Sequence, residues 1–249
     1  MPFLRTTRQM TDAPKLERID CLLGVGTQVR GDLIFSGGLR IDGQVDGDVT
    51  VSCTDAGTLT IGDQGRVAGE VRHKHVLDVL WGAHAEIPGL VRRRLDGVKV
   101  ATHPACHYCK VFPDETLGDH EDFMVPEEML APAGAVATGA YNEKQTHCGA
   151  GFRQRFVNPS LSVAVTQKKL HRLREEQVDV LVHMCPNCHI QYDRYSDIIS
   201  AAAGEEFPFI HLHVQQLLAL ALGADPESVV GVQTHNQDVG PFLERIGAR

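Results

Sequence analysis

The stretch VDVLVHMCPNC, residues 178–188, joins an apolar run of strand length to two cysteines spaced as C-x-x-C. A second stretch, VKVATHPACHYC (residues 98–109), repeats this arrangement, with a short strand followed by Cys106 and Cys109. Helical patterns separate and follow these strands, which predicts an α/β layer with a mostly parallel sheet over residues 73–249. Because the carboxyl ends of parallel strands meet at one edge of a sheet, we expect both cysteine pairs to face one crevice.

The helices of this predicted layer are recognised by apolar residues at helical spacing. Residues 73–95 show the pattern in two pieces divided by Pro88, because proline interrupts a helix. Residues 159–177 are expected to form an amphipathic helix, and residues 214–223 a further helix that ends at Gly223.

A third cysteine lies in KQTHCGAGF, residues 144–152, where small residues after Cys148 let the backbone approach a bound group closely. The chain has seven cysteines, an odd number that argues against a disulfide framework and for metal or redox chemistry. Thiolates are soft donors that bind iron–sulfur clusters or zinc. Five cysteines in three loops therefore predict a metal or cluster site, in preference to buried structural cysteines or a thioredoxin-like pair.

Residues 73–249 resemble the C-terminal half of the heterodisulfide reductase B chain, a family that carries the cysteine-rich CCG domain. The matching motifs are HPACHYCKVFP, HCGAG and MCPNCHIQYDRY, together with the tail FPFIHLHVQQLLALALGADPESVVGVQTH and PFLERIG. The resemblance implies an oxidoreductase acting on sulfur groups, with a noncubane [4Fe-4S] cluster at each motif. It also implies electron transfer to a disulfide or thiol substrate, such as the heterodisulfide of coenzymes M and B. The implied partners are the A and C subunits of heterodisulfide reductase, or similar iron–sulfur and flavin proteins.

The sequence departs from the family pattern at three points. His147 stands where the first cysteine of the Cys-Cys-Gly motif is expected, the interval between Cys106 and His147 is slightly long, and the first CCG half is missing. Cys106, Cys148, Cys185 and Cys188 still supply the four thiolates of a cubane cluster. A noncubane cluster with five donors would recruit His147, because imidazole also ligates iron.

Other donors are open to two interpretations. Cys109 is either a substitute ligand or a bystander thiol. Four histidines are either hydrogen-bond donors to cluster sulfurs or ordinary hydrogen-bonding groups: His103, His107, His183 and His189. Alternatively, the site is a structural zinc in a non-catalytic scaffold, with tetrahedral ligands drawn from Cys106, His147, Cys148, Cys185 and Cys188. The sequence identifies no catalytic residue beyond these donors.

Residues 21–72 follow a different pattern, in which glycines and β-branched residues alternate with polar ones. The motif V-x-G-acid-aliphatic repeats at 29–33, 45–49 and 67–71. Short strands repeating every ~20 residues predict a β-solenoid in preference to an antiparallel meander. The segments GVGTQVRGDLIFSGGLRIDGQVDGDV and GTLTIGDQGRVAGEV resemble the bactofilins, polymer-forming cytoskeletal proteins built as a right-handed β-helix. The resemblance covers the first half of such a domain and implies self-association through the β-helix.

The expected organisation is a disordered tail at residues 1–20, a partial bactofilin-like β-helix at 21–72 and a CCG-like domain at 73–249. The net charge of −8, without a basic stripe, argues against a nucleic-acid partner. The sequence has no run of roughly 18 apolar residues and no apolar core of signal-peptide length. We therefore expect a cytoplasmic protein without a transmembrane segment.

Overall fold

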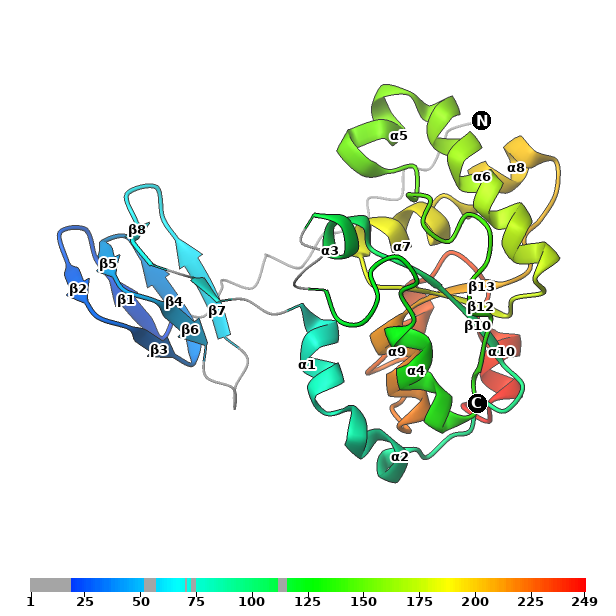
Figure 1. Ribbon diagram of the computed structural model, residues 1–249, viewed down its shortest axis with the longest axis horizontal. Coiled ribbons are helices and arrows are strands. Elements are labelled where there is room, and N and C mark those ends of the chain that lie inside the picture. The colour runs from blue at the N-terminus through cyan, green and yellow to red at the C-terminus, as the bar shows by residue number, and fades with distance from the viewer. Residues whose placement is uncertain (1–18, 52–56, 70, 73–74, 112–115) are drawn as a thin grey trace, which may run out of the picture. The chain divides into compact units, whose positions relative to one another are not determined.

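The computed structural model describes residues 19–51, 57–69, 71–72, 75–111 and 116–249, drawn as a ribbon in Figure 1. The chain divides into two compact units, residues 1–74 and residues 75–249. Each unit has a hydrophobic core of its own. The predicted disordered tail falls almost entirely on residues 1–18, which lie outside the described residues.

Short parallel strands build the N-terminal unit. Its described strands are β1 (Cys21–Leu23), β2 (Gln28–Arg30), β3 (Leu33–Phe35), β4 (Gly37–Ile41), β5 (Gln44–Asp46), β6 (Val49–Val51), β7 (Gly57–Ile61), β8 (Arg66–Val67) and β9 (Val71–Arg72). They pair as three sheets in the orders β1-β4-β7, β2-β5-β8 and β3-β6-β9. Each sheet therefore takes one strand from each of three successive repeats of the chain.

The sequence repeats lie in register between neighbouring strands, as in the Val29–Val45–Val67 row. All of these pairings are parallel, which excludes the antiparallel meander. The repeated glycine has a steric reason, because a Cβ on Gly47 would lie 2.3 Å from the backbone oxygen of Gly31. The buried core belongs to the middle repeat and consists of Leu39, Ile41, Val45 and Val49.

A four-stranded parallel sheet forms the centre of the C-terminal unit. Its strands are β10 (Lys99–His103), β11 (Val136–Ala137), β12 (Val180–His183) and β13 (Ile210–His213), in the order β11-β10-β12-β13. This confirms the predicted strands that precede the two cysteine pairs, whereas β11 and β13 were not predicted. Since β11 pairs on one side of β10 and β12 on the other, the strand order reverses between β10 and β12. Ligands of open α/β sheets bind at such a reversal, outside the carboxyl ends of the strands.

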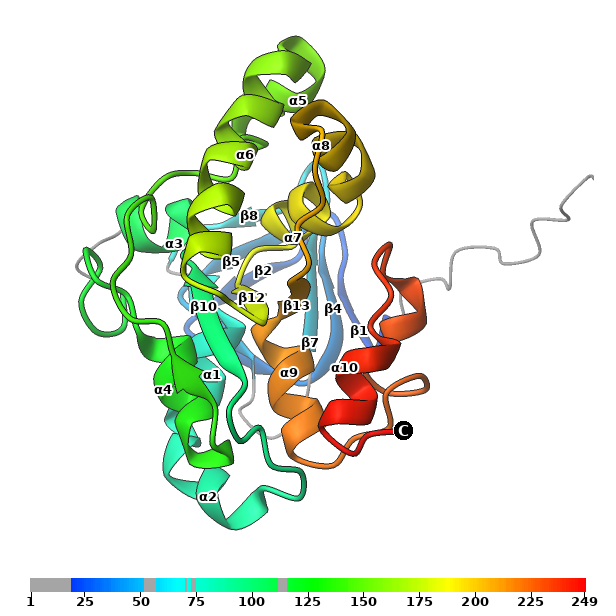
Figure 2. The same ribbon diagram turned by 90° about the vertical axis from the view of Figure 1, so that its right-hand side faces the viewer.

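Helices cover both faces of this sheet (Figures 1 and 2). The α-helices are α1 (Val76–Gly82), α2 (Ile87–Leu90), α3 (Cys106–Lys110), α4 (Val125–Leu130), α5 (Gln154–Val157), α6 (Pro159–Glu175), α7 (Pro186–Asp193), α8 (Ser196–Ala203), α9 (Val214–Ala221) and α10 (Gly240–Arg245). Short 3-10 turns are η1 (His84–Glu86), η3 (Ala131–Ala133), η4 (Gly151–Arg153) and η5 (Val232–Thr234). The hydrophobic cores place α1, α2, α4, α9 and α10 on one face and α6, α7 and α8 on the other.

The predicted helices at 159–177 and 214–223 are confirmed by α6 and α9, with ends that differ by at most two residues. The prediction for 73–95 needs a correction. The pieces α1 and α2 are present, but Pro88 lies in the first turn of α2, where its missing N–H costs no hydrogen bond. The helix ends at Leu90, so residues 91–95 are not helical.

Successive side chains along each strand point alternately into the two cores. Val100 and Val180 pack on the α4/α9 face, whereas Ala101 and Leu181 pack on the α6/α7 face. None of the described helices is both long and apolar enough to cross a bilayer.

Candidate metal centre

Cysteine and histidine side chains gather where β10 and β12 end. His103 is the last residue of β10, and its Cα partner on β12 is His183. Cys185 and Cys188 follow β12, at the N-cap and in the first turn of α7. Cys148 comes from the loop between β11 and η4. These groups therefore meet at the carboxyl edge of the sheet.

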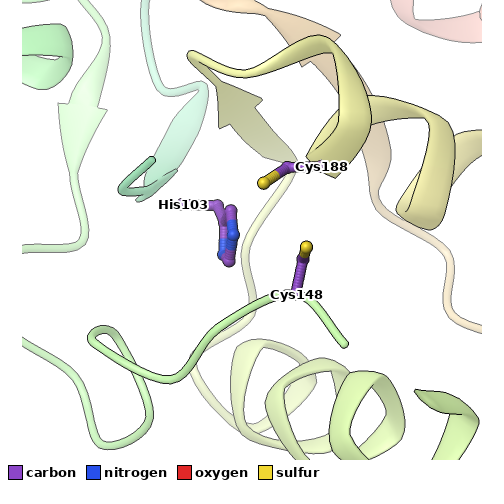
Figure 3. A group of neighbouring side chains, drawn as sticks. All are labelled: His103, Cys148 and Cys188. Atoms are coloured by element: carbon purple, nitrogen blue, oxygen red, sulfur yellow. The ribbon is translucent and has the colours of Figure 1, made fainter. Parts of the chain in front are cut away.

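Three buried groups face one another at this edge: His103, Cys148 and Cys188. One ligand atom from each lies within 4.8 Å of the others. Figure 3 shows the His103 ring and the two sulfur atoms directed toward a common space. Soft sulfur donors in a closed, buried arrangement are what zinc or an iron–sulfur cluster requires.

Cys185 completes a row of three thiols with Cys188 in the middle. Hydrogen bonds with Cys188 lower the pKa of Cys185 to about 5 and that of Cys148 to about 7. The same two contacts, together with burial, raise the pKa of Cys188, because its proton is shared with both neighbours. Thiolate is the form that binds a metal. Cys185 is thus largely thiolate at neutral pH, whereas Cys188 keeps its proton and has to lose it to bind a metal.

The glycine after Cys148 lets its loop press against α6. Gly149 has φ +88°, in the left-handed region that favours glycine, and a Cβ there would lie 2.5 Å from the Ser162 carbonyl oxygen. The Thr166 hydroxyl donates to the Cys148 carbonyl at 2.8 Å. The sequence motif therefore has a physical role: it brings backbone close to a helix and fixes the position of the Cys148 sulfur.

Lys169 on α6 is a buried lysine beside the thiols that the sequence analysis did not single out. Its Nζ lies 2.8 Å from His103 Nδ1 and donates to the carbonyl oxygens of Lys144 at 2.9 Å and Thr146 at 2.6 Å. Burial lowers the pKa of Lys169 to about 7, and the Cys188 and Cys148 thiols oppose that shift. Three acceptors match the three N–H groups of an ammonium.

The contact with Lys169 also assigns a role to His103. Because Nδ1 accepts a hydrogen bond from Lys169, the ring proton of neutral His103 lies on Nε2. Burial, reinforced by the Lys169 charge, lowers the pKa of His103 well below its ordinary value, so the ring is neutral. In this tautomer Nε2 presents a proton and not a lone pair, so His103 becomes a metal ligand only if that proton leaves Nε2.

The other predicted donors lie outside the group formed by His103, Cys148 and Cys188. Cys106 is half-buried at the start of α3, with its Sγ 3.7 Å from His107 Nδ1. His147 is exposed, and its Nδ1 accepts a hydrogen bond from the Gly149 amide at 3.1 Å.

Cys109 is fully buried in the core on the α4/α9 face, whereas Cys148 and Cys188 belong to the core on the α6/α7 face. Burial raises the pKa of the Cys109 thiol to about 12, so it stays protonated. This position favours the interpretation of Cys109 as a bystander thiol.

Comparisons with known proteins agree with both resemblances seen in the sequence. Residues 100–193 match the family model of the cysteine-rich CCG domain, and residues 21–79 match that of the polymer-forming cytoskeletal bactofilins. The B chain of ferredoxin:CoB-CoM heterodisulfide reductase from Methanosarcina acetivorans is 39% identical over 173 residues, which is 70% of this chain and 55% of that protein. The protein of the same name from Methanosarcina mazei is 32% identical over 197 residues, covering 78% and 64%.

A protein of Archaeoglobus profundus that is named as like the heterodisulfide reductase B chain is 31% identical over 188 residues, covering 73% of this chain and 61% of that protein. The chain thus spans between 55% and 64% of the length of these three relatives. The donor set at the end of β10 and β12 fits the metal or iron–sulfur cluster that a cysteine-rich domain of this kind implies, because its thiols are adjacent, two of them are buried, and the half-buried Cys185 has a lowered pKa.

Proposed function

We propose that this chain is the iron–sulfur subunit of a heterodisulfide-reductase-like complex. It carries a bactofilin segment followed by a CCG cysteine-rich domain like that of the heterodisulfide reductase B chain. It accepts electrons from an iron–sulfur or flavin partner, of the kind of the A and C subunits of such complexes, and passes them to a disulfide. The observation that carries this proposal is the row of Cys148, Cys188 and Cys185 thiols at the carboxyl edge of the sheet.

Cys148, Cys185 and Cys188 would hold the cluster together with Cys106, which the motif supplies as a fourth thiolate. His147 would add a fifth donor for a noncubane cluster. A bound [4Fe-4S] cluster supplies one-electron chemistry. The chain contributes the ligands, the buried charge of Lys169 and the N–H of His103.

The substrate class follows from the redox balance and from the relatives. Reduction of one disulfide to two thiols consumes two electrons and two protons. The names of two relatives specify the CoB-CoM heterodisulfide as their substrate. We infer an organic disulfide of that class for this chain, in a reducing cytoplasmic compartment where free cysteines persist.

Metal analysis of chain prepared without oxygen tests the cluster. We expect about four irons and four acid-labile sulfides per chain, with Mössbauer parameters of iron bound by sulfur. One zinc per chain without iron would contradict the redox proposal and favour a structural zinc site in a scaffold.

We infer further that residues 21–72 form a short right-handed β-helix that self-associates, and that the cluster domain occupies residues 73–249. Support comes from the three parallel sheets, the stacked repeats and the bactofilin match. The strands β1 and β7 each pair with β4 alone among the described strands, so both offer a free edge to a second copy.

Sedimentation velocity at rising concentration tests this self-association. We expect the sedimentation coefficient to increase with concentration as copies add through the strand edges. A monomer at every concentration, with the cluster domain folded, would contradict self-association and leave the cluster proposal standing.

A further inference from the structure

A second cluster of metal-binding side chains includes two residues of α7, the helix whose first turn carries Cys188. His189 and Asp193 are four residues apart on α7, so they share one face of the helix. His235 follows η5 and completes the group, with one ligand atom from each of the three within 4.8 Å of the others. They line a cavity of about 340 Å³.

We propose that His189, Asp193 and His235 bind a divalent transition metal, zinc or ferrous iron, at a site separate from the thiols. Two imidazoles and one carboxylate are a donor set for these ions that leaves coordination positions open to water or a small ligand. The site needs no cysteine and does not rest on the proposed redox function.

Hydrogen bonds outside the cluster already hold two of the donors as ligands require. The His189 ring is hydrogen-bonded to the backbone of His211, while its buried Nε2 has no hydrogen-bond partner among the described residues. Both carboxylate oxygens of Asp193 lie 3.2 Å from the backbone nitrogen of Asn236, whose N–H donates to them. A ligand histidine that is tethered through its other nitrogen, and a carboxylate held by backbone, are typical of metal sites.

The side chain of His235 is 2% exposed, and its Nδ1 lies 3.5 Å from Asp193 Oδ1. Its Nε2 lies 3.0 Å from the amide nitrogen of Gln216. Gln216 is held in this orientation, because its oxygen accepts from the His213 amide at 2.9 Å and its nitrogen donates to the Val230 carbonyl at 3.0 Å. Without an ion, the proton of neutral His235 therefore lies on Nδ1, which has no hydrogen-bond partner among the described residues.

Binding of a cation through Nδ1 moves that proton to Nε2, where the Gln216 amide presents a donor and not an acceptor. The glutamine must turn over for the ion to bind, which weakens the site. A glutamate at the same position would accept from both the His213 amide and His235 Nε2–H, although it loses the hydrogen bond to the Val230 carbonyl. Gln216→Glu is thus expected to tighten metal binding, an effect that neither misfolding nor loss of packing produces.

Cobalt(II) added to the full-length chain without oxygen distinguishes the two sites. Cobalt on thiolates gives strong charge-transfer absorption in the near ultraviolet, whereas cobalt on nitrogen and oxygen gives weak visible bands alone. We expect one equivalent of cobalt bound to nitrogen and oxygen. Zinc displaces this cobalt, and the Asp193→Asn and His235→Gln chains do not bind it. A matched control is His171→Gln, which alters a partly exposed histidine paired with Glu205 and is expected to change nothing.

For Gln216→Glu we expect cobalt affinity to rise about tenfold, the size of effect that outer hydrogen-bond partners have on metal sites. The proposal is wrong if all bound cobalt shows thiolate charge transfer, or if Asp193→Asn and His235→Gln bind it as the unaltered chain does. Unchanged or weaker binding by a folded Gln216→Glu chain would also overturn the assigned geometry.

Discussion

Replacing Cys188 by serine is expected to reduce the iron bound per chain by at least about tenfold. Cys188 is the middle thiol of the row and contacts both Cys148 and Cys185, so its loss removes one ligand and separates the other two. Serine preserves the size of the side chain, but its hydroxyl does not ionise near neutral pH. Iron and acid-labile sulfide, measured in chain prepared without oxygen, give the result directly.

Cys109→Ser is the matched control, because Cys109 is also buried and also ends a C-x-x-C pair. We expect unchanged iron content, with a cost to stability of about 1–3 kcal/mol for placing a hydroxyl in an apolar core. Trp81, the one tryptophan of the chain, packs against that core, and its fluorescence during denaturant unfolding measures this cost. Equal iron loss in both variants would show that cluster binding follows general stability and not the thiol row.

The different fates of Cys109 and Cys188 show where the sequence stops being informative. Both cysteines end a C-x-x-C pair that follows a parallel strand. In α7 the helix begins after Cys185, which is its N-cap, whereas in α3 the helix begins at Cys106 itself. A shift of one residue at the helix start rotates the later side chains by about 100°. That rotation depends on packing around each helix, which the spacing of cysteines does not encode.

Local patterns predicted most of the scaffold. Apolar runs gave β10 and β12, and the V-x-G-acid-aliphatic repeat gave the register of the N-terminal strands. β13 was missed although its sequence, IHLH, alternates as a strand does, because it is only four residues long, and β11 was missed because it is two residues long. Both are recognised as strands through their pairing with neighbours that are distant in sequence.

Lys169 was missed for a related reason. A lysine in an amphipathic helix such as α6 is expected on the solvated face, and its neighbour Lys168 does lie there, with its side chain 67% exposed. Lys169 is fully buried because the segment before Cys148 folds over it and presents two carbonyl oxygens. Only the tertiary contact between residues 144–146 and α6 turns this lysine into part of the site.

Lys169→Met is expected to destabilise the C-terminal unit by about 3–9 kcal/mol. The substitution leaves His103 Nδ1 and the carbonyl oxygens of Lys144 and Thr146 without their donor, and each unsatisfied buried group costs about 1–3 kcal/mol. Denaturant unfolding followed by Trp81 fluorescence measures the loss. Lys168→Met is the control: it removes an exposed ion pair with Glu143, and such pairs contribute about 0–1 kcal/mol.

The same pair of variants tests whether Lys169 acts on the bound cluster. In its protonated form Lys169 places a buried positive charge beside the thiolates and favours electron addition, so below its pKa of about 7 the removal of Lys169 is expected to shift the reduction potential of the cluster to more negative values. The loss of Lys169 also frees Nδ1 of His103, so that the ring no longer has to present its proton toward the sulfurs. Lys168→Met leaves both the Lys169 charge and the His103 tautomer in place, so the reduction potential of the cluster is expected to stay unchanged. Equal potentials in the two variants, with the cluster retained, would reduce Lys169 to a purely structural residue that holds the Cys148 loop.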